Sequence, residues 1–270
     1  MKIIEPNNKI FLSEDFQKDK YKFHLILKNL SSPELELYSD EENYVLCRGG
    51  KEWPTWIWTR DNIEKNKIIE IEELIKLYLT DKDKDKFTCK KEVYALLVER
   101  NFKNINLEDY FEMGFLICNK AIKPKDCDCK LYLAKQEEKE ILTKYWYEDS
   151  REMRGVGAVT IEQAQKDIEE LIKTGKFFVL KNKKGKIVCM ASYSVTENQA
   201  KISHVYTPKE ERRKGYATSL IYELTKILLS KGFVPVLYTD YNYIASNKAY
   251  KNAGYEDQGI LINFTCSNNK

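Results

Sequence analysis

The stretch Ile202–Lys231, ISHVYTPKEERRKGYATSLIYELTKILLSK, decides how the second half of the chain is organised. A strand leads through Pro208 and a charged turn into a helix whose apolar side chains recur on one face. Gly215 opens that helix without a Cβ to hold a ligand away, and the first helical amides have no partner within the helix. Because the basic run Arg212–Lys214 adds charged donors, the stretch predicts an anion cradle that suits a pyrophosphate.

A second pattern follows the next strand, which ends at Leu237–Asp240. The segment Asn242–Gly254 predicts a short helix that stops at its glycine. Ser246, Asn247 and Tyr250 are spaced so that their side chains share one face of that helix. Taken alone, a tyrosine on such a helix is more often a core residue, and a basic turn can simply cap a helix. Either pattern alone is thus weak, and it is their occurrence together that favours a functional site over a structural one.

The pair Arg212-x-x-Gly215-x-Ala217 and Ser246-Asn247-x-x-Tyr250 resembles the GCN5-related N-acetyltransferase (GNAT) superfamily over about residues 127–264. The segments VYTPKEERRKGYA and SNKAYKNAGY also resemble a bacterial subgroup with an extra N-terminal region. The order of elements in the second half is strand, two helices, three strands, helix, strand, helix, strand. We therefore expect an α/β (α+β) fold with a mixed, mostly antiparallel sheet flanked by helices, preceded by a smaller α/β domain.

The resemblance implies roles for single residues. In the family the loop binds the pyrophosphate of acetyl-coenzyme A, and a bulge in the preceding strand opens an edge with which pantetheine pairs. The Val205 N–H then faces the acetyl carbonyl, and Tyr250 is the expected general acid for the departing thiolate. The coenzyme-binding residues that we expect are Val205, Tyr206, Thr207, Arg212, Arg213, Lys214, Gly215, Tyr216, Ala217, Thr218, Asn242, Asn247 and Tyr250.

The general base is less defined by the residues. His204 adjoins the acetyl site, but strand alternation places it opposite Ser203 and Val205, which favours a core or supporting role. Lys201 stands where some members of the family carry a glutamate. A water-mediated base is therefore the default expectation.

The acceptor is expected to be a small-molecule or peptide amine. In this fold the loop between the first two helices lines the acceptor pocket, and here we place it at Tyr145–Ser150. Glu148 and Asp149 in that segment would recognise an ammonium group. A solvated helix end with a packed tryptophan explains the same segment equally well.

Composition narrows the class of protein. The 270 residues carry a net charge of +3 with both signs interleaved, which disfavours nucleic-acid binding. No segment has the roughly 20 apolar residues that cross a bilayer, so we expect no membrane partner and a cytoplasmic location. The seven cysteines suit reduced thiols. Cys127-Asp128-Cys129 has too short a spacing for a zinc site, so no metal is expected.

In the first half the sequence predicts a hairpin and several helices, but no R-x-x-G-x-G/A loop. We expect a linker at Asn119–Lys130 and therefore two domains, residues 1–125 and 126–270. The N-terminal domain has an order similar to a degenerate GNAT domain, and we expect it to close the acceptor cleft or form a homodimer. The other expected elements are a helix at 11–30, a hairpin at 35–59, helices at 63–79 and 92–100, a solvated link at 81–86 and a strand at 111–118.

The leading functional hypothesis is an acetyl-coenzyme A-dependent N-acetyltransferase, an acyltransferase that acts on a primary amine by direct attack in a ternary complex. The alternative is a non-catalytic acyl-coenzyme A sensor or scaffold with the same cradle. An acyl group longer than acetyl also stays open.

Overall fold

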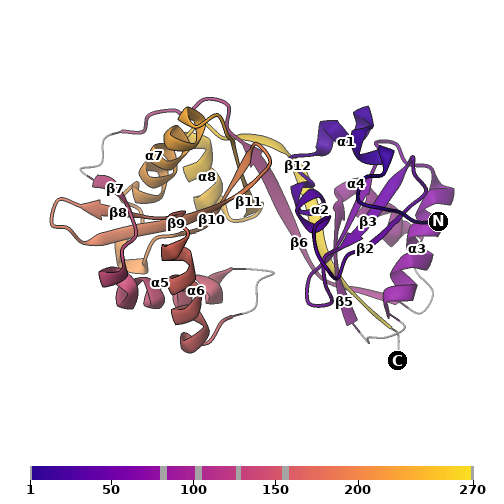
Figure 1. Cartoon of the computed structure of the whole chain (residues 1–270), viewed down its shortest axis with the longest axis horizontal. Coiled ribbons are helices and arrows are strands. Elements are labelled where there is room, and N and C mark those ends of the chain that lie inside the picture. Colours follow the sequence, from indigo (N-terminus) through magenta and orange to yellow (C-terminus); the bar gives the residue numbers. More distant parts are fainter. Residues whose placement is uncertain (1, 80–83, 101–104, 126–128, 154–157, 269–270) are drawn as a thin grey trace. The chain divides into compact units, whose positions relative to one another are not determined.

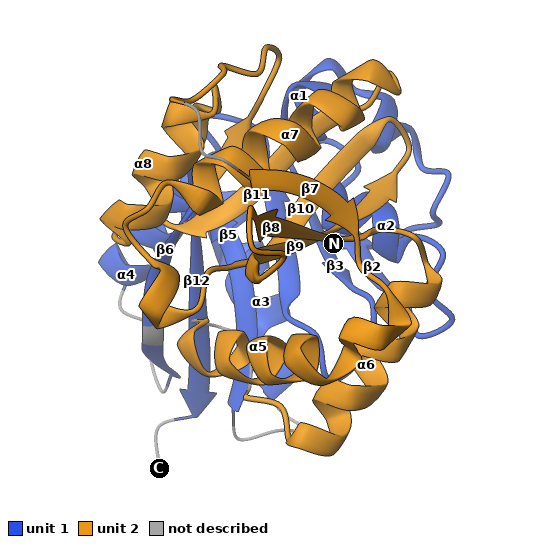
Figure 2. Cartoon of the chain, turned by 90° about the vertical axis from the view of Figure 1, so that its left-hand side faces the viewer, with its two compact units in different colours: residues 1–114, 259–270 blue, residues 115–258 orange. Residues whose placement is uncertain are grey.

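The computed structural model describes residues 2–79, 84–100, 105–125, 129–153 and 158–268 (Figure 1). The chain divides into two compact units, residues 1–114 with 259–270 and residues 115–258 (Figure 2). The sequence instead placed a boundary between residues 125 and 126. The difference arises because two long strands, Ile105–Ile117 and Glu256–Asn268, each run from one unit into the other.

The first unit contains a sheet in the order β1-β2-β3-β4-β5-β12-β6. The pairs β2–β3, β3–β4 and β5–β12 are antiparallel, whereas β4 and β5 are parallel. Its elements are β1 (Lys2–Ile3), η1 (Lys9–Leu12), α1 (Glu14–Asp19), α2 (His24–Asn29), β2 (Glu36–Ser39), β3 (Tyr44–Arg48), β4 (Thr55–Thr59), α3 (Lys65–Leu79), β5 (Lys84–Lys90), α4 (Lys91–Glu99) and β6 (Ile105–Ile117).

The core of the first unit lies between its sheet and the apolar faces of α3 and α4. The predicted hairpin is confirmed by the pairing of β3 with β4, and the two later helices lie where periodicity placed them. The helix expected at 11–30 is wrong, because the segment forms η1, α1 and α2, with Ser13 starting α1 by accepting a hydrogen bond from Phe16 N at 3.2 Å. The solvated link is also wrong over Lys84–Lys86, which belongs to β5.

The second unit contains strands in the order β6-β11-β10-β9-β8-β7. Within it β7, β8, β9 and β10 pair antiparallel, whereas β10 and β11 are parallel. The remaining elements are β7 (Cys129–Leu133), η2 (Gln136–Glu138), α5 (Lys139–Glu152), α6 (Ile161–Lys173), β8 (Phe177–Asn182), β9 (Ile187–Thr196), β10 (Gln199–Tyr206), η3 (Lys209–Glu211), α7 (Tyr216–Ser230), β11 (Val234–Asp240), α8 (Ile244–Asn252) and β12 (Glu256–Asn268).

Helices cover both faces of the second unit's sheet (Figure 1). On one face α7 and α8 bury a core with Leu220, Leu224 and Tyr250. On the other face α5 and α6 bury a separate core with Trp146 and Ile168. The predicted class, a mixed and largely antiparallel sheet between helices, is confirmed. Among the described residues no helix has the length and apolarity to span a membrane.

The segment Tyr145–Ser150 is not a loop. It lies within α5, which continues to Glu152 before the chain turns at Met153. The residues expected to line an acceptor loop are therefore arranged with helical spacing. As a result Glu148 and Asp149 project from a helix that packs beside β10.

Candidate active site

The site is built on a strand pair that opens partway along its length. β10 and β11 pair in parallel through Gln199–Lys201 and Val234–Val236, and this register ends there although both strands continue. On its other edge β10 pairs with β9 until Ser203 faces Ser192, and pairing resumes only where Tyr206 faces Met190. This step sets one more residue on β10 than on β9, which is a β-bulge. The predicted bulge and opened edge are thus both present.

The bulge places His204 in an unusual backbone conformation. Its φ is 54°, in the left-handed region that non-glycine residues seldom occupy. Its ring lies on the α5 side of the sheet, where Nδ1 is 2.9 Å from Asp149 Oδ2. The imidazole also lies against the indole of Trp146, with the ring centroids 3.9 Å apart. His204 is half-buried, not a core residue, because the bulge interrupts the alternation on which the sequence argument relied.

The turn between β10 and α7 has the backbone of an anion cradle. Arg213 and Gly215 have φ angles of 66° and 81°. Gly215 precedes the first residue of α7, and within the described chain no side chain caps that helix start. Nothing lies within 4 Å of the position that a Cβ on Gly215 would take. The amides of Tyr216, Ala217 and Thr218 therefore begin α7 beside open space, as a bound pyrophosphate requires.

Two of the three basic side chains in this turn are held by protein groups. Arg212 donates to Glu152 Oε2 at 2.7 Å and to the carbonyl of Thr207 at 2.9 Å. Lys214 donates to Glu211 Oε2 at 2.8 Å. Hydrogen bonds from Lys186 and Lys214 lower the pKa of Glu211, which keeps it ionised. Of the three basic residues in this turn, only the exposed Arg213 has no ion pair with another described residue. The backbone amides are therefore the main donors that the cradle offers to an anion.

Tyr250 is buried against the sheet on α8, with an exposed fraction of 8%. Burial raises the pKa of its hydroxyl, Ser246 lowers it through a hydrogen bond, and the charge of Asp149 raises it further. The phenol therefore remains protonated at neutral pH and can act as a proton donor. The influence of Asp149 also shows that these two side chains lie within electrostatic range of each other.

Asn247 and Asn242 hold the turn between β11 and α8. The Asn247 amide donates to the carbonyls of Asp240 and Tyr241 at 3.1 and 2.8 Å. The backbone N–H of the exposed Asn242 donates to Asp240 Oδ1 at 3.0 Å. Coenzyme binding by these two asparagines stays a prediction, since their recorded donors serve the turn itself.

The predicted acceptor residues both contact β10. Glu148 accepts a hydrogen bond from Tyr206 Oη at 2.8 Å, and Asp149 is the partner of His204. The hydroxyl of Thr207 contacts Cys189 Sγ at 3.2 Å. Sequence reasoning missed the link between α5 and the bulge. The sequence predicts a helix that ends near residue 147. If that helix is continued to residue 152, helical spacing places Glu148, Asp149 and Glu152 on one acidic face.

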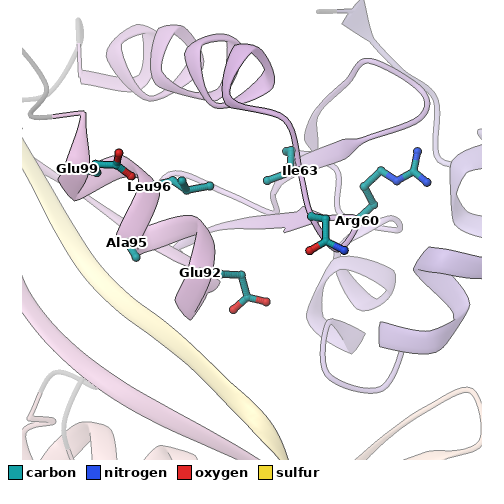
Figure 3. Close-up of a pocket in the computed structure, with 7 residues that line it drawn as sticks. Arg60, Ile63, Glu92, Ala95, Leu96 and Glu99 are labelled. Carbon is teal, nitrogen blue, oxygen red and sulfur yellow. The ribbon is translucent and has the colours of Figure 1, made fainter.

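The first unit has a pocket of about 310 Å³ between the residues that follow β4 and helix α4 (Figure 3). Arg60 and Ile63 lie on one side and Glu92, Leu96 and Glu99 on the other. Two carboxylates in the lining disfavour a phosphate ligand, because like charges would be brought together. The second unit has a cavity of about 450 Å³ lined in part by Asn247, Lys248 and Lys251 of α8.

Residues 133–255 match the family model described as the acetyltransferase (GNAT) family. This part of the chain is a GNAT acetyltransferase domain. The GNAT family implies acyl transfer from acetyl-coenzyme A, and the prediction of an acyltransferase is confirmed at this level. The match covers the bulged strand, the glycine turn and α8, which together form the site described above.

Solved structures with the same fold extend over nearly the whole chain. A GNAT acetyltransferase from Colwellia psychrerythraea is 14% identical with a TM-score of 0.61, and 98% of each chain is covered. One from Sphaerobacter thermophilus is 11% identical with a TM-score of 0.66, covering 98% of this chain and 94% of that chain. At these identities the likeness is one of fold. No curated protein sequence matches the chain.

The GNAT domain fits acetyl-coenzyme A in two independent features. The open edge of β10 offers backbone groups for the pantetheine, and the uncapped start of α7 offers amides for the pyrophosphate. Among the described residues no cluster of side chains could hold a metal ion.

Proposed function

We propose that the protein transfers an acetyl group from acetyl-coenzyme A to a primary amine by direct attack in a ternary complex. The observation that carries this proposal is the opened β10–β11 pair, which ends beside the uncapped helix α7 and the buried phenol of Tyr250. The acceptor is a small-molecule or peptide amine. Homodimer formation and a cytoplasmic location stay predictions.

In this mechanism the amides from Arg213 to Thr218 bind the pyrophosphate, and the Val205 N–H donates to the acetyl carbonyl oxygen. Val205 lies within the bulge, where neither it nor His204 has a register partner among the described residues of β9. Acetyl-coenzyme A supplies the acyl group as a thioester. A donor preorganised at the carbonyl oxygen stabilises the charge that develops there by a few kcal/mol. Tyr250 Oη donates a proton to the leaving sulfur, which titrates near the range of ordinary thiols.

Calorimetric titration with acetyl-coenzyme A tests the binding step. We expect one molecule bound per chain and no binding by Gly215→Glu, because a carboxylate would then stand where the phosphates lie. Gly185→Glu is the matched control, since Gly185 also has a positive φ and nothing within 4 Å of its Cβ position, but lies in the β8–β9 turn. The proposal fails if the native chain binds no acetyl-coenzyme A.

Turnover separates the enzyme from the rival hypothesis, an acyl-coenzyme A sensor. Release of free thiol is followed over a panel of spermidine, an aminoglycoside, a free amino acid and a lysine-containing peptide. An enzyme releases thiol with at least one of these amines faster than with none. A sensor binds acetyl-coenzyme A and releases no thiol above the background rate.

A further inference from the structure

Resting on the proposed function, we propose that Nε2 of His204 is the general base that takes a proton from the acceptor amine, and that Asp149 is its positioning residue. This assignment replaces the water-mediated base that the sequence suggested. It is carried by the bulge in β10, the contact with Asp149 and the packing against Trp146.

The bulge turns His204 toward α5. Along an unbroken strand every second side chain lies on the same face, so Ala200, Ile202, His204 and Tyr206 would share one. Instead Ala200 and Ile202 belong to the core under α7 and α8, whereas Tyr206 belongs to the core under α5 and α6. The side of the sheet therefore changes between residues 202 and 206. His204 follows Tyr206 to the α5 side, where an unbroken strand could not have placed it.

Asp149 fixes which nitrogen of the ring is available. Its carboxylate is nearly buried, with an exposed fraction of 8%, and Oδ2 is 2.9 Å from His204 Nδ1. Because an ionised carboxylate only accepts hydrogen bonds, Nδ1 carries the proton of the neutral ring. The lone pair then resides on Nε2. The side chain of His204 is 24% exposed, so the ring is not sealed from an incoming amine.

Trp146 holds the ring in this orientation. The two rings are inclined by 32° with centroids 3.9 Å apart. The indole is itself anchored, since its Nε1 donates to Asp167 Oδ2 of α6 at 3.0 Å. A base held by both a carboxylate and an aromatic face retains one orientation through the reaction, which general-base catalysis requires. His204 also immediately precedes Val205, so the base and the proposed carbonyl donor are neighbours in the chain.

The proton balance is complete without a further reactant. Nε2 takes one proton from the substrate ammonium, which leaves a neutral amine and an imidazolium next to the carboxylate of Asp149. The amine nitrogen then bonds to the acetyl carbon, the carbon–sulfur bond breaks, and Tyr250 protonates the sulfur. The imidazolium and the product nitrogen lose their extra protons to solvent, from which Tyr250 is reprotonated. Free ammonium groups are weaker acids than imidazolium, so this transfer is uphill, and Asp149 assists it because its carboxylate stabilises the imidazolium that forms.

Several other titratable groups surround the dyad, and the test has to separate them from His204. From α5 they are Glu148 and Glu152; from β10 and the following turn they are Tyr206 and Arg212; from β9 and α8 they are Cys189 and Tyr250. Glu148 is bonded to Tyr206 and Glu152 to Arg212, so each of these carboxylates has its own partner.

The kinetic test compares His204→Gln and Asp149→Asn with the native chain, using the amine that gives the fastest thiol release. In the native profile kcat/KM should rise with pH, because only the neutral imidazole has a lone pair that can accept the proton of the amine. His204→Gln should lower kcat/KM by at least about a hundredfold and abolish this rise. Asp149→Asn removes the charge that favours the imidazolium, so the rise should move to lower pH and reach a lower plateau.

A purely structural role would lower the plateau in both variants and leave the position of the rise unchanged. Glu140→Gln is the matched control, because Glu140 is an exposed carboxylate on the same helix. Calorimetry with acetyl-coenzyme A should give the same affinity for all four proteins, since the dyad does not contact the pyrophosphate turn.

Nuclear magnetic resonance tests the dyad without any acceptor. The chain has only two histidines, so the imidazole nitrogen signals that vanish in His204→Gln belong to His204. We expect the Nδ1–H tautomer for the neutral ring in the native protein. The Nε2–H tautomer would overturn the proposal, as would a native kcat/KM profile that His204→Gln leaves unchanged in shape and height.

The outcomes also distinguish this inference from the proposed function. Thiol release that persists in His204→Gln with the native pH profile overturns the dyad alone. Absence of thiol release with every amine in the native protein overturns the proposed function and, with it, the role of His204 as a base.

Discussion

Tyr250 and Tyr255 show how two buried phenols on neighbouring positions serve different purposes. Their rings pack against each other with centroids 6.4 Å apart. Tyr255 shares a buried hydrogen bond of 2.8 Å with Thr225 Oγ1, which ties it to α7. Tyr250 instead faces Ser246 and feels the charge of Asp149. The hydroxyl of Tyr255 is thus held by a residue of α7, whereas that of Tyr250 is the one that we propose as the proton donor.

Tyr250→Phe should lower kcat by about a hundredfold or more while acetyl-coenzyme A binds with native affinity, because the ring is kept and only the proton donor is lost. Since burial raises the pKa of Tyr250, the native kcat should show no alkaline fall from this group through neutral and mildly alkaline pH. Steady-state thiol release and calorimetry measure the two effects. Tyr255→Phe is the control: it should lower stability by about 1 kcal/mol and leave kcat unchanged. Equal kcat values for the two variants would contradict the assignment.

Two glycines with positive φ, Gly254 and Gly175, differ in how much space a Cβ would have at their positions. Gly254 has a φ of 100°, and a Cβ there would lie 2.4 Å from the backbone oxygen of Lys120. Gly175 has a φ of 64°, and a Cβ there would have nothing within 4 Å. Both substitutions strain the backbone, but only the first also forces two backbone segments apart.

Gly175→Ala should therefore lower the free energy of unfolding by about 1 kcal/mol, whereas Gly254→Ala should cost several times as much. Thermal unfolding of the two variants measures the difference. Similar shifts in Tm would show that the contact between Gly254 and Lys120 can relax.

Helices and strands with a regular apolar period could be predicted from the sequence, and irregular ones could not. The period of α3 and the turn signals around β3 and β4 are local, so their prediction succeeded. β5 begins with alternating charges, and the carboxylate of Asp85 is buried where Arg48 of β3 lies 3.0 Å from it. Such a partner, distant in the sequence, leaves no local signal.

At the candidate site, too, local sequence patterns allowed a prediction and contacts between residues distant in the sequence did not. The glycine turn and the helix that carries Tyr250 follow from short local patterns. The bulge at His204 inserts one residue into a strand whose composition looks regular, so its effect on side-chain direction appears only once β9 and β10 are paired. For this reason His204 is half-buried and not in the core, whereas the supporting role that the sequence also predicted for it is not contradicted.

The turn between β2 and β3 depends on one carboxylate. Asp40 accepts hydrogen bonds from the amide and side chain of Asn43, both at 2.7 Å, and pairs with Lys67 at 3.0 Å. Burial alone would raise the pKa of Asp40, but the hydrogen bonds from Asn43, Glu42 and Lys67 lower it to about 2. A carboxyl whose folded pKa is lowered stabilises the fold above its unfolded pKa and loses this effect as the pH falls through the folded value.

Asp40→Asn should destabilise the protein by about 1 kcal/mol at neutral pH, a figure reduced from the full shift because the site is partly exposed to solvent. The difference from the native chain should shrink as the pH is lowered from about 4 toward 2. Denaturant unfolding at several pH values measures it. Glu52→Gln, an exposed neighbour in the same unit, should show no such trend. A difference that stays constant with pH would contradict the role of Asp40.

The stretches β2–β6 and β8–β12 follow the same order of elements: three antiparallel strands, a helix, a strand parallel to the third, a helix and a long strand. The connections after the third strand differ. The connection from β10 to α7 contains Gly215 and leads to a helix with no side-chain cap. The connection from β4 to α3 reads Arg60-Asp61-Asn62-Ile63-Glu64 and contains no glycine. Lys90 is bonded there to Asp61 at 2.7 Å. Because only the connection before α7 has the glycine turn of an anion cradle, we expect one binding site for acetyl-coenzyme A per chain.

The first unit completes its sheet with a strand from the far end of the sequence. Leu261–Ser267 of β12 pair antiparallel with Lys84–Lys90 of β5. Phe264 is 2% exposed, and its ring lies 5.7 Å from that of Phe87 and 5.0 Å from that of Tyr94. The core of the first unit therefore depends on a residue beyond the GNAT domain.

Phe264→Ala should lower the free energy of unfolding by about 3–5 kcal/mol through the cavity that it leaves. Amide hydrogen exchange should show loss of protection along β5. Val98→Ala, at a half-exposed position of α4 in the same unit, should change little. Unchanged protection along β5 would mean that β12 does not stabilise the first unit.

This use of a late strand has a consequence for biosynthesis. Thr88 and Asn263, which hydrogen-bond at 2.9 Å across the β5–β12 pair, are 175 positions apart in the chain. While the ribosome is still translating the intervening segment, the backbone N–H and C=O groups along one edge of β5 have no partner strand. Such an unpaired edge can associate with other nascent chains. The amino-terminal portion should thus be unable to mature as the polypeptide emerges, and expressing it as a separate fragment should yield insoluble material.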